Sequence, residues 1–126
     1  MEKYELGQNK KSFSLFFNGG EIWCEHLDSL YNEKELLKQK FNQDLVQISK
    51  PSTSSFVAVA LDESDVDREM LEYIINSFVM LNKPLRKVVF VGLNARMKNY
   101  IKKKNIETLF TMICIDDFEK AKEWLV

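Results

Sequence analysis

The chain has 126 residues, of which 45% are hydrophobic and 29% charged, and its formal net charge is −1. This length suffices for one domain with its own core, and the composition excludes an intrinsically disordered chain. The near-zero charge argues against a general attraction to nucleic acid or to an anionic membrane, and no apolar run approaches the roughly 20 residues of a membrane span.

The chain begins with a polar segment, residues 1–11, which we expect to be loose or to form an edge element. This segment lacks the apolar core and the small-residue cleavage site of a signal peptide. We therefore expect a cytoplasmic protein whose single domain covers residues 12–126.

Two extended runs, residues 12–17 and 21–27, flank Asn18-Gly19-Gly20. This pattern predicts either a β-hairpin or a single strand that ends in a Gly-rich turn. Cys24 and His26 lie two apart in the second run and so share a face. With one His in the chain they are too few for a tetrahedral metal site, so we interpret them as a partly buried thiol beside a surface histidine.

Helical periodicity predicts four helices in the rest of the chain. Apolar residues recur every three or four positions after residues 32, 64, 94 and 116, and each of these positions holds a residue type that favours helix starts. We expect the helices to be capped by Asn32, Ser64, Asn94 and Asp116, with Glu35 and Glu119 in supporting positions.

Three apolar runs alternate with these helices and predict buried strands at residues 56–61, 87–93 and 109–115. The resulting order, β(β)αβαβαβα, predicts a single α/β domain with a central mixed, mostly parallel sheet flanked by helices. The third run contains the second cysteine, Cys114. We expect Cys24 and Cys114 to be reduced core residues and not a disulfide.

The element order and two motifs carry a family resemblance. The strand from Val88 to Leu93 is followed by NARMKNYIKKKNIETLFTMICIDDFEKAKEWL, and Gly20-Glu21-Ile22 follows the first strand. In these features residues 12–126 resemble the STAS domain of bacterial anti-anti-sigma factors and of sulfate-transporter tails. The resemblance implies a STAS-like fold and a regulatory module that binds another protein.

The chain departs from this family at its phosphorylation motif. Regulated members carry Asp-Ser-x-Gly or Asp-Ser-Ser-Gly at the start of the helix after the second core strand. Here the corresponding stretch is LDESDVDREML, in which Asp65, Val66 and Asp67 occupy the region and no Gly is present. Ser64 is the nearest hydroxyl and has the spacing of a helix cap, so we do not expect a phosphoserine switch.

Charged residues gather in two segments. Acids surround the start of the predicted second helix, where they could form an interaction surface or simply stabilise the helix through its dipole. A Mg²⁺ site there would match no ligand motif, so we predict no metal. The segment from Lys83 to Lys104 holds eight bases and no acid. We interpret it as a solvated outer face, with an anion-binding or acidic-partner surface as the alternative, and do not expect nucleic-acid binding.

No nucleophile–base pair, catalytic carboxylate pair or phosphate-binding loop is recognisable, so we predict no enzyme, no catalytic residue and no cofactor. We expect a non-enzymatic, regulatory protein-interaction module of the bacterial cytoplasm. The alternative is a small-ligand or lipid-binding domain of the same fold, which a cavity among Val66, Met70, Phe90 and Met97 would favour. The residues predicted to bind the partner are Ser64, Asp65, Val66, Asp67 and Arg68.

Overall fold

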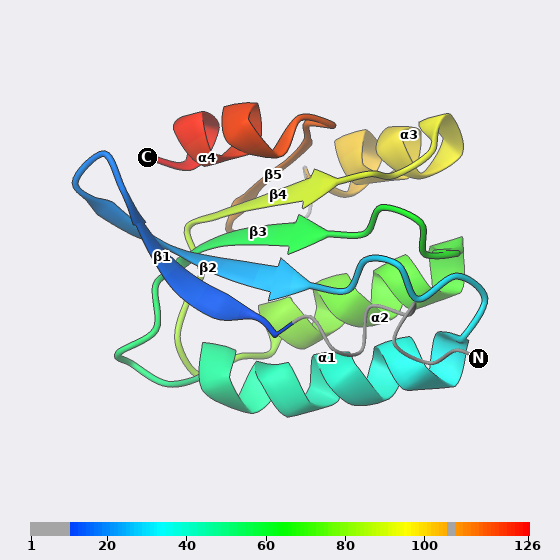
Figure 1. Ribbon diagram of the computed structural model, residues 1–126, viewed down its shortest axis with the longest axis horizontal. Helices are drawn as coiled ribbons and strands as arrows, with labels where there is room; N and C mark the ends of the chain where they lie inside the picture. Colours follow the sequence, from blue (N-terminus) through cyan, green and yellow to red (C-terminus); the bar gives the residue numbers. More distant parts are fainter. Residues whose placement is uncertain (1–10, 106–107) are drawn as a thin grey trace.

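The computed structural model describes residues 11–105 and 108–126 and arranges them as one sheet with helices on both faces (Figure 1). The strands are β1 (Phe13–Phe17), β2 (Gly20–His26), β3 (Phe56–Ala60), β4 (Lys87–Val91) and β5 (Thr111–Cys114). The helices are α1 (Lys34–Ile48), α2 (Arg68–Val79), α3 (Ala95–Lys104) and α4 (Phe118–Leu125). In this part of the chain no helix is long and apolar enough to cross a membrane. The expected loose or edge segment, residues 1–11, lies outside the described residues except for Lys11.

The strands lie in the order β1-β2-β3-β4-β5, with β1 antiparallel to β2 and every other pair parallel. Each parallel step is made through a helix, as the βα repeats require. The predicted α/β class, element order and mixed, mostly parallel sheet are confirmed.

The hairpin, one of the two alternatives at the N-terminal end of the domain, is confirmed. Phe17 pairs with Gly20, so the connecting loop is Asn18-Gly19. Both loop residues have positive φ, 49° and 83°. Asn and Gly adopt this conformation more readily than other residues, and such two-residue turns match the twist of the flanking strands.

Alternation along the strands divides the core between the two faces of the sheet. On one face Trp23, Val59 and Phe90 pack with the inner sides of α1, α2 and α3. On the other face Cys24, Ala58 and residues of the neighbouring strands pack under α4. Figure 1 shows α1 and α2 below the sheet and α4 above it. β3 and β4, which have a parallel neighbour on each side, are buried and apolar on both faces.

The predicted helix caps are partly wrong. Asn94 does cap α3, its Oδ1 accepting from the Met97 N–H at 2.9 Å. The other caps lie one to three residues further along, because the expected residues are used elsewhere. Ser64 bonds to a neighbouring loop and Asp116 pairs with Lys98, while Asn32 lies within a turn that the Glu33 N–H closes on the Leu30 carbonyl. The N-cap positions are Glu33 in α1, which makes no side-chain cap bond, Asp67 in α2 and Asp117 in α4.

Candidate functional site

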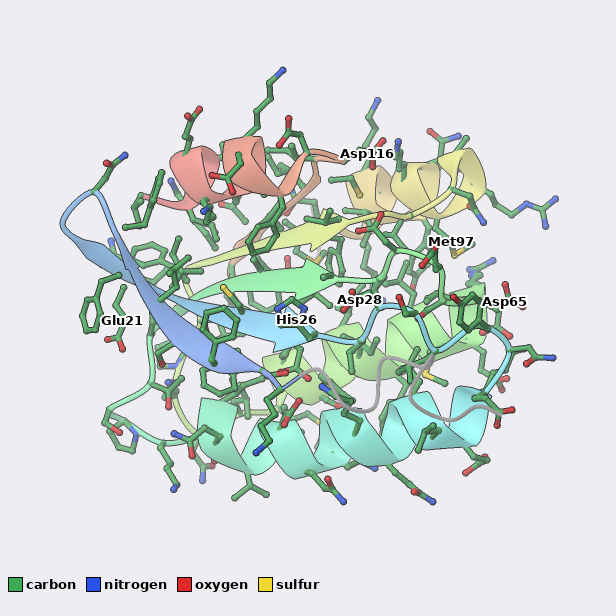
Figure 2. All side chains as sticks on the ribbon, in the orientation of Figure 1. Glu21, His26, Asp28, Asp65, Met97 and Asp116 are labelled. Atoms are coloured by element: carbon green, nitrogen blue, oxygen red, sulfur yellow. The ribbon has the colours of Figure 1, made fainter. Side chains whose placement is uncertain are left out.

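An open cavity of about 980 Å³ lies between α2 and α3, beyond the carboxyl ends of the parallel strands. All five residues predicted to bind a partner line it, together with loop residues 92–94, one side of α3 and Lys34 at the start of α1. Figure 2 shows two of the lining residues, Asp65 and Met97, at this end of the molecule. Ligands of open α/β sheets characteristically bind at this edge, so the cavity is the candidate site.

Residues 64–67, which line the cavity, belong to the loop 61–67, and this loop runs beside the loop 27–33. The Tyr31 N–H donates to the Glu63 carbonyl at 2.8 Å, and the Asp65 N–H donates to the Tyr31 carbonyl at 2.7 Å. The Ser64 hydroxyl donates to the Leu27 carbonyl at 2.5 Å and accepts from the Leu30 N–H at 3.0 Å. Ser64 therefore holds the two loops together.

Three non-glycine residues of these loops have positive φ: Ser29 at 60°, Tyr31 at 50° and Glu63 at 58°. Each such residue costs about 1–3 kcal/mol, and it persists only where the surrounding bonds impose it. Here the imposing bonds are those between the loops, including the Ser29 hydroxyl to Glu63 Oε1 at 3.1 Å. The hydrogen bonds between the two loops therefore support the segment that lines the cavity.

The Asp67 carboxylate, at the mouth of the cavity, accepts hydrogen bonds from two donors. Its Oδ1 accepts from the Met70 N–H at 2.8 Å, and its Oδ2 accepts from Lys34 Nζ at 2.8 Å. These bonds, that to Lys34 first, lower the pKa of the Asp67 carboxyl, and the same contact raises the pKa of Lys34. The opposite charges of Lys34 and Asp67 cancel, and the ion pair connects the start of α1 to the start of α2.

The α3 side of the cavity carries cations on an exposed stripe. Arg96, Asn99 and Lys103 recur at helical spacing and all line the cavity, while Met97 on the inner side reaches its apolar floor with Val66. Asn99 also borders a smaller depression of about 450 Å³ on the other flank of α3, toward β5. The sequence pattern assigned these bases to a solvated face and gave no sign that a cavity adjoins them.

Two contacts join α2 to α3 across the cavity. Arg68 lies over the Tyr100 ring, 5.3 Å from its centroid, and the Tyr100 hydroxyl donates to Glu72 Oε2 at 3.1 Å. Partial burial, followed by the bond to Glu72, raises the pKa of Tyr100. Arg68 is thereby held at the cavity by an aromatic ring, which leaves its N–H groups for a ligand.

The acids around the start of α2 do not form one surface. Asp67 and Glu72 are bonded within the protein as described, and Asp62 is not among the residues that line the cavity. Partial burial and the nearby carboxylates of Asp28 and Asp116 raise the pKa of Asp62. Among the described residues no group of three or more His, Cys, Asp or Glu side chains could hold a metal ion. Asp65 is the acid that remains exposed at the cavity.

Cys24 and His26 share a face of β2 but differ in environment. Cys24 is buried, and burial raises the pKa of its thiol to about 11 despite the opposing charge of Lys122. His26 stacks between Phe13 and Phe118, with its Nδ1 3.1 Å from Asp28 Oδ1 (Figure 2). A protonated, enclosed thiol is a poor nucleophile, so this geometry does not favour a Cys–His dyad. Both cysteines are free, as predicted.

A buried carboxyl, Glu25, was missed by sequence reasoning. It is 1% exposed on the α1 side of β2; its Oε1 accepts from Trp23 Nε1 at 2.8 Å, and its Oε2 meets no donor in the described part of the chain. Burial first, and then a hydrogen bond to Asp44 of α1, raises the pKa of Glu25 well above its ordinary value. Glu25 lies two residues after Trp23 in the strand, so the two side chains share the face of the sheet that packs on the core. This spacing is the signal that could have revealed the buried acid.

Comparison of the chain with protein-family models, with curated proteins and with solved structures finds no match. The candidate site therefore rests on its geometry. Ser64–Arg68, α3 and Lys34 are brought together at one cavity, whereas Cys24, His26 and Glu25 lie on the sheet.

Proposed function

We propose that this protein is a non-enzymatic interaction module of the bacterial cytoplasm, regulatory in role and similar in kind to STAS domains. A partner protein would dock into the cavity between α2 and α3. The contact surface is the segment Ser64–Arg68 together with the facing side of α3. The element order and the mixed sheet are compatible with the STAS resemblance, which stays a proposal.

One observation carries this proposal: the segment chosen from sequence and the polar side of α3 face each other across an open cavity, and hydrogen bonds to the loop 27–33 hold that segment in place. A segment held in this way loses little conformational entropy when a partner binds. Asp65 and Arg68 are exposed and are positioned to contact the partner. Ser64 and Asp67 contribute by holding the loops and the helix start.

The alternative of a small-ligand or lipid-binding domain is less well supported by the structure. All four residues named for such a pocket belong to the buried core, and two of them, Val66 and Met97, also line the open cavity. A lipid chain would be expected to lie in an enclosed apolar pocket. A ligand of the alternative kind would instead have to be polar and partly exposed.

The proposal is tested by blocking the cavity without changing its charge. Asn99→Trp places a large side chain on the α3 side of the cavity, at an exposed position. Gln43→Trp on α1 adds the same exposed indole away from the cavity, and Ala95→Trp adds it where it borders the smaller depression alone. Each variant is compared with wild type as bait for lysate of the source cell, after circular dichroism has confirmed folding.

We expect a specific protein to be retained by wild type and by both control variants, and to be lost with Asn99→Trp. Loss with Ala95→Trp as well as with Asn99→Trp would move the surface to the smaller depression, which both residues border. Retention by every bait, or no specific protein on any, would refute the proposed surface. In the latter case native mass spectrometry would test for a bound polar small molecule.

A further inference from the structure

The cavity carries a surplus of positive charge although the protein as a whole is slightly acidic. Its lining includes four cations, Lys34, Arg68, Arg96 and Lys103, against two carboxylates, Asp65 and Asp67. The Lys34–Asp67 ion pair is closed at 2.8 Å and cancels. Three cations then face one exposed acid.

In the part of the chain that the structure describes, these three cations form no ion pair with another side chain. Within residues 11–105 and 108–126, Arg96 and Lys103 form no ion pair, and Arg68 contacts the face of Tyr100, which leaves its charge in place. Arg96 and Lys103 are exposed on one side of α3, and Arg68 reaches the cavity from α2. Cations supplied by two helices thus surround a single hollow, and charge complementarity favours an anionic occupant.

The spacing of the cations indicates an extended occupant with several charges. Arg96 and Lys103 are seven residues apart, which corresponds to roughly 10 Å along the helix axis at 1.5 Å per residue. In a peptide segment of polyproline II conformation, which has three residues per turn, residues three apart point to the same side and are separated by about 9 Å. Carboxylates at every third position of such a segment would therefore match the two cations, with Arg68 facing a carboxylate from the opposite side.

We propose that the cavity binds an acidic segment of the partner protein, one whose glutamates or aspartates recur every third residue and pair with Arg68, Arg96 and Lys103. This inference rests on the proposed function and names the chemistry of the partner. A nucleic acid fits less well, because the nearby aromatic ring, Tyr100, is covered by Arg68 and is not free to stack on a base. A compact phosphate fits less well, because the cations are spread along α3.

The test is a direct binding measurement that needs no natural partner. A fluorescein-labelled peptide with three glutamates at every third position, separated by glycine and serine, is titrated with the full-length protein by fluorescence anisotropy. The same peptide with glutamines in place of the glutamates is the control ligand. Sodium tripolyphosphate and a decameric single-stranded RNA are added as competitors.

Two variants with the same net charge separate local recognition from general attraction. Arg96→Glu/Lys103→Glu reverses the charge of the cavity, and Lys102→Glu/Lys120→Glu makes the same change at exposed positions that do not line it. We expect the first variant to weaken binding of the glutamate peptide at least ten-fold and the second less than two-fold. The glutamine peptide should bind at least ten-fold more weakly than the glutamate peptide, and added salt should weaken the glutamate peptide several-fold.

Equal losses in the two variants would overturn the inference in favour of non-specific attraction. No binding of the glutamate peptide would also overturn it, as would displacement of the peptide by tripolyphosphate or RNA at lower concentrations than by unlabelled peptide. The proposed function is judged separately, with the lysate experiment. A partner protein that is lost with Asn99→Trp but retained by Arg96→Glu/Lys103→Glu would support the cavity as a docking site and contradict the inference that an acidic segment binds there.

Discussion

Gly92 sets the approach of the loop after β4 to the loop after β3. Its φ is +96°, and a Cβ built on it would lie 2.5 Å from Asp62 Oδ1 and 2.7 Å from the Asp62 nitrogen. Since backbone cannot move aside as a flexible side chain can, this position requires glycine. The contact holds one side of the cavity in place, because Gly92 lines it.

We predict that Gly92→Ala lowers the free energy of unfolding by about 2–4 kcal/mol, from backbone strain plus the overlap with Asp62. Gly19→Ala is the matched control, because Gly19 also has a positive φ, +83°, but a Cβ there meets nothing within 4 Å. Urea unfolding followed by circular dichroism measures both. Equal destabilisation by the two substitutions would show that the approach to Asp62 is unimportant.

Asp67 illustrates how one side chain serves both a helix and a tertiary contact. We predict that Asp67→Ala costs about 1 kcal/mol of stability at pH 7 through loss of the cap, and that Asp67→Asn, which keeps a cap, costs less. Because the folded-state pKa of Asp67 is lowered, its ionic contribution is present above the unfolded-state pKa and disappears as the pH falls through the folded-state value. Urea midpoints of wild type and Asp67→Asn should therefore converge on acidification. Midpoints that diverge toward acid would contradict this account.

At the scale of elements, the contact between β2 and α1 contains a polar cluster. Ser12 donates to Asp44 Oδ2 at 2.7 Å, Lys40 lies 3.4 Å from the same oxygen, and Lys40 also donates to the His26 carbonyl. Glu25 lies beside this cluster with a raised pKa. When Glu25 is ionised, its Oε2 and Asp44 are both acceptors; when it is protonated, it can donate to Asp44, so burial favours the neutral form.

The sign of the resulting pH dependence is opposite to that of a salt-bridged acid. Because the folded-state pKa of Glu25 is raised, the folded state binds more protons, and stability falls as the pH rises above the unfolded-state value of about 4.5. We predict that Glu25→Gln raises the free energy of unfolding at pH 8 by about 1–2 kcal/mol, because Gln can donate to Asp44 without ionising. The advantage should vanish near pH 4.

Urea titrations between pH 4 and pH 8 measure this effect, with Glu35→Gln at an exposed position of α1 as the control. The control should leave the pH profile of wild type unchanged. A Glu25→Gln protein that is less stable than wild type at pH 8 would show that the carboxylate is tolerated in place.

At the scale of the whole molecule, the reactivity of the two cysteine thiols measures how well the helices cover the sheet. Cys24 packs under α4 and Cys114 packs on the opposite face of the sheet, and burial raises the pKa of each thiol to about 11. The thiolate fraction at pH 7 is therefore very small, and access to the buried Cys24 also requires opening of the structure.

We predict that both thiols react with Ellman's reagent at least a hundred-fold more slowly in the native protein at pH 7 than in 6 M guanidinium chloride. Cys114, which is half-buried, should react before Cys24. Stopping the reaction with iodoacetamide and mapping the modified peptides measures the order. Immediate reaction of both thiols would mean that the sheet is not covered as described.

The fold was largely predictable because its signals are local. Alternating and continuous apolar runs marked every strand, three- and four-residue spacing marked every helix, and Asn18-Gly19 marked the hairpin turn. The caps were harder, since Ser64, Asp67, Asp116 and Asp117 are all suitable cap residues. Which of them caps depends on where the others find hydrogen bonds, and that is a property of the folded chain.

The sequence by itself determined the class of this protein, the order of its elements and the segment Ser64–Arg68 as a candidate contact, because periodicity and composition act over a few residues. The tertiary structure alone decided that Lys34 pairs with Asp67, 33 residues away, and that the Ser64 hydroxyl joins two loops. It also decided that the bases of α3 face a cavity and that Glu25 is buried. Contacts between distant segments follow from how the sheet and helices pack, and they leave no repeating pattern along the chain.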